Sequence, residues 1–271
     1  MTRLSLAHLT AVDLPPPALV EAAAAAGFDA VGLRLIKVTP DSPGYPLMDD
    51  PAAMRATRAA LAATGLAVSD IEFVKLTPET GIDALLPFLD AGAELGAAQA
   101  ITAPYDPDLS RLADTLGAFA EAAAARGLGT VMEFFPWTSV PDLATCLRVV
   151  GQAGPGVGML VDSLHFDRSG SSLAALAAVD PARLPFAHLC DAPRHPPYTT
   201  EQLLFTAREG RMIPGQGQID LSAFLRALPA GLPLGLEIPG LPGYRAADPV
   251  PALTALVAAT RALVERASAA A

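Results

Sequence analysis

The chain has 271 residues, of which 52% are hydrophobic, and a formal net charge of −10 at pH 7. This composition supports a large core and argues against intrinsic disorder, while the acidic balance disfavours nucleic acid as a partner. No apolar run reaches the length of a membrane span, no signal peptide is recognised, and Cys146 and Cys190 are too few for a disulfide framework, so we expect a cytoplasmic protein with reduced thiols.

Short apolar runs alternate with Ala- and Leu-rich amphipathic stretches along the chain. The apolar runs are bounded by Gly and Pro and are typical of buried parallel strands; they lie at 4–9, 30–36, 67–74, 98–102, 129–135, 158–162, 186–190 and 234–238. A helix is expected after each strand, because Pro and Ser suit a first turn. These helices are predicted to begin near Pro16, Pro51, Glu79, Asp108, Ser139, Ser171, Leu221 and Pro249. Four of them are expected to end at Gly27, Gly65, Gly96 and Gly127.

Eight strand–helix units in a chain of this length predict an α/β fold of the (β/α)8 TIM barrel type, as a single domain over residues 1–271. A doubly wound open sheet is the alternative. That fold usually carries a Gly-rich phosphate loop after its first strand, and residues 10–15 contain no glycine. The sequence therefore favours the barrel.

The fifth to eighth predicted strands each end in a carboxylate or an imidazole: Glu133, Asp162, His188 and Glu237. Because the active groups of a barrel lie at the C-terminal ends of its strands, these four side chains are expected to converge on one half of the mouth. Three carboxylates and one imidazole suit a hard or borderline divalent cation. The structural alternatives are a buried ion pair for the glutamates, a local hydrogen bond between Asp162 and His165, and a satisfied core imidazole for His188.

A set of short motifs follows the same order as these residues. Taken together, they resemble the sugar phosphate isomerase/epimerase superfamily, also called xylose-isomerase-like TIM barrels. The resemblance covers nearly the whole chain and is strongest from Val131 to Pro239. The motifs are Glu133-Phe134-Phe135-Pro136, Val161-Asp162-Ser163-Leu164-His165-Phe166 followed by Arg168-Ser169-Gly170, His188-Leu189-Cys190-Asp191, Gly210-Arg211 with Pro214-Gly215-Gln216-Gly217, and Leu236-Glu237-Ile238-Pro239.

The resemblance implies one divalent metal ion held by the four residues at the strand ends. The oxygen-rich ligand set favours manganese, magnesium or cobalt, with zinc as an alternative. It also implies substrate contacts from His165 and Arg194. The chain departs from the pattern at two positions, because relatives often carry Glu where Gly32 stands and Pro-Gly-Glu-Gly where this chain has Gln216. Both changes remove a carboxylate from near the mouth.

Four further residues are candidates for substrate binding, and each has a structural alternative. Arg211 could meet a substrate phosphate or carboxylate, or form a surface salt bridge. Trp137 could wall the substrate or only pack. His8 points either to the mouth or into the barrel. Glu72 could replace the carboxylate missing at Gly32, or lie on the surface.

The longest irregular stretch is predicted at about 192–218, where Pro and Gly are frequent. Long ordered loops in compact domains are usually functional, so we expect this one to cover the mouth and to carry Arg194 and Arg211 towards substrate. His195 is expected to face solvent. Asp191, just before the loop, could accept a hydrogen bond that orients His188 or an arginine, or could cap the loop.

Two reactions fit such a site. The first is metal-dependent isomerisation or epimerisation of a keto sugar or related hydroxy-ketone through an enediolate, with Glu133 and Glu237 moving the protons. The second is dehydration, by a lyase, of a cyclic polyol ketone or a dehydroshikimate-like acid, with His165 as the general acid. A sugar-binding barrel without activity is the non-enzyme alternative. The family's DNA-repair endonuclease branch needs more than the four histidines present here.

The expected partner is a small carbohydrate-like molecule, in keeping with a role in carbohydrate metabolism. Neither nucleic acid nor a membrane is expected to bind, and a homo-oligomer is compatible with the sequence.

Overall fold

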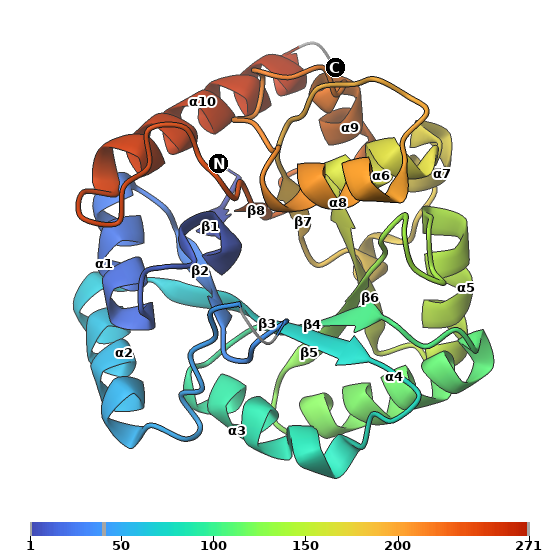
Figure 1. The fold of residues 1–271 in the computed structure, drawn as a ribbon, viewed down its shortest axis with the longest axis horizontal. Coiled ribbons are helices and arrows are strands. Elements are labelled where there is room, and N and C mark those ends of the chain that lie inside the picture. Colours follow the sequence, from blue (N-terminus) through green and yellow to red (C-terminus); the bar gives the residue numbers. More distant parts are fainter. Residues whose placement is uncertain (1, 40–41, 270–271) are drawn as a thin grey trace.

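Eight parallel strands close into a barrel in the order β1 to β8 (Figure 1). The computed structural model describes residues 2–39 and 42–269. β8 pairs with β1 in parallel, with Leu4 opposite Leu234, so the sheet has no free edge. The predicted TIM barrel is confirmed. Its strands are β1 Leu4–Leu6, β2 Ala30–Arg34, β3 Ala67–Leu76, β4 Gln99–Pro104, β5 Gly129–Glu133, β6 Val157–Asp162, β7 Ala187–Leu189 and β8 Leu234–Leu236.

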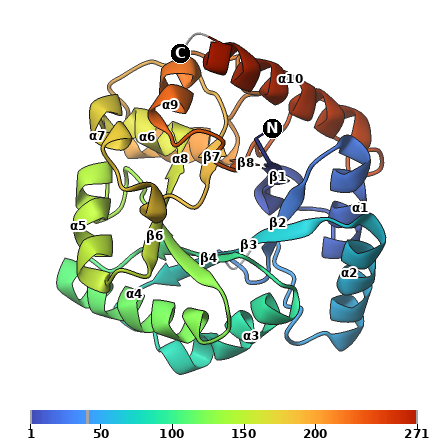
Figure 2. The same cartoon turned by 180° about the vertical axis from the view of Figure 1, so that it is seen from behind.

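Helices surround the barrel, as the view from behind also shows (Figure 2). Local side chains determine several helix ends. The carboxylates of Asp50 and Asp108 cap the N-termini of α2 and α4. The four glycines predicted to end helices all have positive φ. The helices are α1 Pro16–Ala26, α2 Pro51–Thr64, α3 Leu86–Glu94, α4 Leu109–Ala124, α5 Leu143–Ala153, α6 Ser163–Ser169, α7 Leu173–Ala177, α8 Thr200–Arg208, α9 Leu221–Ala227 and α10 Val250–Ala269.

Some helix boundaries differ from the prediction. The helix expected near Glu79 begins only after a hydrogen-bonded turn between Thr77 and Thr80, as the 3-10 segment Ile82–Leu85 followed by α3. The helix expected near Ser139 begins at Leu143, because Asp142 supplies the cap. The 192–218 stretch was expected to be irregular, but it contains α8. This helix starts with a reciprocal capping box between Thr199 and Gln202.

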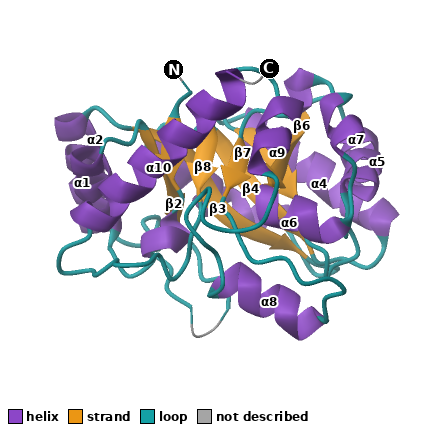
Figure 3. Cartoon of the chain, turned by 90° about the horizontal axis from the view of Figure 1, so that it is seen from above, coloured by secondary structure: helices purple, strands orange, loops and turns teal. Residues whose placement is uncertain are grey.

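Two apolar compartments hold the barrel together. The larger lies between the strands and the surrounding helices, and a smaller cluster of Ile101, Val131, Leu160 and Phe186 packs separately from it. The loops after the strands, together with α8, lie on one side of the barrel (Figure 3). Cys146 and Cys190 are buried and unpaired, as expected. Among the described residues, no helix combines the length and hydropathy that a bilayer span needs.

Candidate functional site

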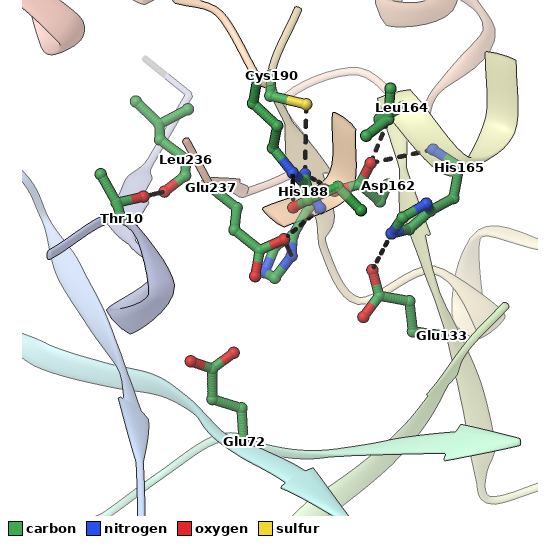
Figure 4. Close-up of polar contacts among 12 residues, drawn as sticks. Thr10, Glu72, Glu133, Asp162, Leu164, His165, His188, Cys190, Leu236 and Glu237 are labelled. Carbon is green, nitrogen blue, oxygen red and sulfur yellow. Dashed lines mark hydrogen bonds and ion pairs between the residues drawn. The ribbon is translucent and has the colours of Figure 1, made fainter. Parts of the chain in front are cut away.

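The ends of β5 to β8 bring four potential metal ligands together, as the strand order predicted (Figure 4). Glu133 ends β5, Asp162 ends β6, His188 lies in β7, and Glu237 directly follows β8. One ligand atom from each residue lies within 4.8 Å of those of the other three, and all four residues are buried. The side chains therefore converge on one point at the mouth.

This cluster fits a divalent cation by its chemistry. Glu133 Oε1 and both ring nitrogens of His188 are buried without a hydrogen-bond partner. Buried polar atoms are normally paired, so atoms left unpaired around one point suit an ion. Three oxygens and one nitrogen match the preference of hard and borderline cations. Gly235 leaves room for the imidazole, because a side chain there would lie 2.6 Å from His188 Cδ2.

Arg211 is buried in the site and contacts two of the potential metal ligands. Its Nη1 is 2.6 Å from Asp162 Oδ2, and its Nη2 is 2.8 Å from Glu237 Oε2. Burial by itself would raise the pKa of Asp162, but Arg211, His165 and His188 together outweigh burial and lower that pKa to about 2. The predicted alternative of a surface salt bridge is wrong, because both side chains are buried. Arg211 thus holds two of the clustered carboxylates in place.

His165 and Trp137 form one wall of the site. His165 Nε2 lies 3.8 Å from Glu133 Oε1, and its backbone N–H donates to Asp162 Oδ1. Its ring meets Phe135 and Trp137 edge-on, at centroid distances of 4.8 and 5.2 Å. Burial lowers the pKa of His165 to about 4. Trp137 is half-buried and stacks on Phe135, so it both packs and walls the site.

The opposite side of the mouth carries a buried ion pair. Glu72 points into the same space as the ligand cluster (Figure 4) and is buried, so the surface alternative is wrong. Arg34 Nε lies 3.3 Å from Glu72 Oε1. Burial raises the pKa of Glu72 to about 7, although Arg34 opposes this shift. Sequence reasoning missed Arg34, although a charged residue inside the apolar run at 30–36 was the signal.

The space beside Gly32 is occupied by the carboxylate of a second acidic residue of β3, Asp70. A side chain at Gly32 would place its first carbon 2.5 Å from Asp70 Oδ1, so the Asp70 carboxylate fills that space. Asp70 is buried, and Ser69 Oγ donates to its Oδ2 at 2.7 Å. The signal in the sequence was its spacing of two residues from Glu72, which puts both side chains on one face of a strand.

Two candidate substrate contacts lie outside the cluster. His8 is fully buried: its Nδ1 accepts from the backbone N–H of Arg34 at 2.8 Å, and its Nε2 donates to Leu14 O at 2.9 Å. Both ring nitrogens are therefore used within the fold, and burial lowers the pKa of His8 to about 4. Arg194 is exposed and pairs with Asp167 at 2.9 Å. His195 is exposed, as expected.

Asp191 caps the loop that follows β7 and does not orient His188. Its two carboxylate oxygens accept hydrogen bonds from the backbone N–H groups of Ala192, Gly215, Gly217 and Ile219. Asp191 also exchanges two backbone hydrogen bonds with Met212, at 2.9 and 2.8 Å. Because Met212 is the neighbour of Arg211, this pinned loop positions the Arg211 guanidinium.

Comparison with known proteins agrees with this architecture. A family model described as xylose isomerase-like TIM barrel matches residues 20–259. Inosose isomerase from Bacillus velezensis is 31% identical over 119 residues, which is 43% of this chain and 40% of that protein. The 3-dehydroshikimate dehydratase of Pseudomonas putida is 32% identical over 145 residues, which is 52% of this chain and 22% of that protein. Each match thus spans less than half the length of the relative.

A solved structure shares the fold across its whole length. The structure of the IOLI protein with a bound zinc atom superimposes with a TM-score of 0.79 at 20% identity, covering 98% of this chain and 99% of that one.

Proposed function

Because this chain belongs to the xylose isomerase-like TIM barrel family, we propose that it is a divalent-metal-dependent isomerase or epimerase of a polyhydroxy ketone. The observation that carries the proposal is the pair of buried glutamates, Glu133 and Glu237, which belong to one convergent set of three carboxylates and an imidazole. Two carboxylates at one reaction centre can remove a proton from carbon and return it. The similarity to an inosose isomerase supports this reaction class.

Glu133, Asp162, His188 and Glu237 would hold the cation, and manganese, magnesium or cobalt suits their oxygen-rich set, with zinc as the alternative. A cation held there would polarise a carbonyl group and stabilise the negative charge that develops on its oxygen.

Glu133 is the better candidate for the first proton acceptor. Its Oε1 has no hydrogen-bond partner, whereas Glu237 Oε2 forms an ion pair with Arg211 Nη2 at 2.8 Å. A carboxylate held by a guanidinium is a weaker base than one without such a partner. Glu133 would therefore take the α proton and exchange it with solvent. Glu237 would first take a proton from a substrate hydroxyl or from water, and would then deliver it to the neighbouring carbon or to the opposite face of the same carbon.

The charges at the mouth favour a neutral substrate. Arg34 and Arg211 have buried side chains, and each pairs with a carboxylate. A guanidinium already neutralised by a partner gains little from a substrate carboxylate, but an arginine–carboxylate pair offers both donors and acceptors to hydroxyl groups. The aromatic wall of Phe135 and Trp137 suits the C–H face of a sugar or cyclitol ring.

Dehydration remains the second candidate, because of His165. Its Nδ1 is buried without a partner and its Nε2 lies 3.8 Å from Glu133, so the imidazole is placed to assist a leaving hydroxyl group. The similarity to a 3-dehydroshikimate dehydratase favours the same reading.

One experiment separates the two reactions. The manganese-loaded protein is offered inososes, keto sugars and dehydroshikimate in deuterated water, and products are followed by NMR and by ultraviolet absorbance. The proposal expects deuterium at the α carbon and an isomeric product without loss of water. Growth of aromatic absorbance from dehydroshikimate, without isomerisation of any ketone, would overturn it.

Variants then test the two glutamates. Glu133→Gln is expected to abolish solvent exchange, whereas Glu237→Gln should still exchange the α proton without completing turnover. Metal content is measured on both variants, since the Gln oxygen can still bind the cation. The exposed Glu121→Gln serves as a control and should behave as wild type. Near wild-type turnover in both site variants would refute the two-carboxylate mechanism.

A further inference from the structure

Beneath the ligand cluster, the barrel interior holds buried polar atoms without partners. His188 Nδ1 lies 3.8 Å from Glu237 Oε2 and so faces the other ligands. Its Nε2 lies on the side of Gly235, 2.9 Å from where a side-chain carbon of that residue would stand. This nitrogen has no hydrogen-bond partner, and neither has Asp70 Oδ1. A metal-binding histidine normally donates its second ring N–H to a carboxylate, a carbonyl or a water.

Three polar groups from different strands border this space. Ser5 Oγ on β1 is 3.3 Å from the same point beside Gly235, so the hydroxyl and the imidazole border one small volume. Asp70 enters from β3 over Gly32, which has no side chain to exclude it. Burial raises the pKa of Asp70, and among the groups that lower it His188 has the largest effect, as expected for neighbours in a low-dielectric interior.

The lower end of the barrel is open to water beside Ser5 and Ser69. A cavity of about 140 Å³ there is lined by Ser5, Ser69 and Gln99, among others. Ser69 is the residue whose hydroxyl donates to Asp70 Oδ2. A buried water is stable where it finds two to four polar partners, and Ser5, Asp70 and His188 supply three.

We propose that Asp70 is a positioning residue for His188, acting through one ordered water that the Ser5 hydroxyl also holds. The imidazole Nε2–H donates to the water, and the water donates to the Asp70 carboxylate. These two hydrogen bonds fix the His188 tautomer that carries its proton on Nε2, so that the Nδ1 lone pair faces Glu133, Asp162 and Glu237. The Asp191 carboxylate is engaged by four backbone N–H groups, which leaves Asp70 for this role. The proposal rests on the metal site of the proposed function.

The test compares manganese affinity with the stability of the metal-free protein. Asp70→Asn is expected to weaken manganese binding by about 10- to 100-fold, measured by competition with a fluorescent chelator. The same substitution should leave the urea midpoint of the metal-free protein unchanged or higher, because it removes a buried carboxylate that has no cationic partner. A structural role predicts the opposite, a lower midpoint with unchanged affinity, and that result would overturn the proposal.

Two more variants and a control sharpen the result. Gly32→Ala should also weaken binding, because its new methyl group displaces the Asp70 carboxylate, and the double variant Gly32→Ala/Asp70→Asn should be less than additive. Thr130→Val is the matched control, because Thr130 is as buried as Asp70 and its hydroxyl has no hydrogen-bond partner either. This substitution should leave the manganese affinity unchanged. Fully additive effects of Gly32→Ala and Asp70→Asn on manganese affinity would contradict the proposed connection between Asp70 and His188. An equal loss of affinity in Thr130→Val would contradict it as well.

Nitrogen-15 NMR of the metal-free protein reads the tautomer directly. The Nε2–H form of His188 should dominate in wild type and lose population in Asp70→Asn. A wild-type protein that binds no divalent cation would sink the proposed function and this inference together. Tight binding that Asp70→Asn does not alter, with an unchanged tautomer, would sink this inference alone.

Discussion

Replacing Asp191 by Asn is expected to lower the free energy of unfolding by about 3 to 6 kcal/mol, because two of four charge-assisted hydrogen bonds are lost at about 1.5 to 3 kcal/mol each. Oδ1 accepts from the N–H groups of Ala192 and Ile219 at 2.9 and 3.1 Å. Oδ2 accepts from those of Gly215 and Gly217 at 3.0 and 2.9 Å. An Asn amide keeps one accepting oxygen and turns an NH2 donor towards two other donors, so two N–H groups lose their partner.

Urea unfolding of the two proteins measures the loss, and hydrogen exchange at Gly215 and Gly217 localises it. The control is Asp108→Asn, where both backbone N–H groups bind the same oxygen of an exposed cap, Oδ1, which Asn retains. It should cost no more than about 0.5 kcal/mol, since Asn and Asp cap helices equally well. If Asp191→Asn stays within about 1 kcal/mol of wild type and both amides remain protected, the hydrogen-bond argument fails.

Three further outcomes follow from the same contacts. Arg211→Met should destabilise the chelator-treated protein by about 3 to 5 kcal/mol, because the carboxylates of Asp162 and Glu237 lose the buried guanidinium that pairs with them. Saturating manganese should restore part of this stability. Equal losses of melting temperature with and without metal would contradict the pairing. His8 has a pKa of about 4 when folded against 6.5 in the unfolded chain, so the unfolded state takes up the proton first as pH falls. Stability should therefore drop by about 3 kcal/mol between pH 6.5 and pH 4, and His8→Gln should lack this component in urea unfolding at pH 7.5 and 4.5; an identical acid loss in the variant would refute the assignment. Arg194→Ala should keep its bound metal and lose at most about 1 kcal/mol of stability, because its ion pair with Asp167 is exposed; metal loss, measured by elemental analysis, would show that it supports the site.

The barrel was predictable from the sequence because its causes are local. Apolar runs bounded by Gly and Pro indicate buried strands, and proline at Pro16 and Pro51 suits a first helical turn wherever the helix packs. The ligand cluster was predictable for a related reason. Closing eight parallel strands brings their C-terminal ends to one mouth, so residues such as Glu133 and Glu237 at strand ends must approach each other.

The sequence could not predict which charges pair across the barrel. Arg211 is 49 residues from Asp162 in the chain, and only the pinned loop after β7 brings its guanidinium to that carboxylate. Whether Asp191 orients a histidine or caps a loop depends on where the N–H groups of Gly215 and Gly217 lie, and no local pattern encodes that.

The sequence by itself determined the fold class and four of the groups at its mouth, because hydrophobic periodicity and turn residues act over a few positions. The tertiary structure alone decided the roles of Arg34, Asp70 and Arg211. Their partners come from other strands and loops, and the energy of a buried charge depends on distances that exist only once the barrel has closed.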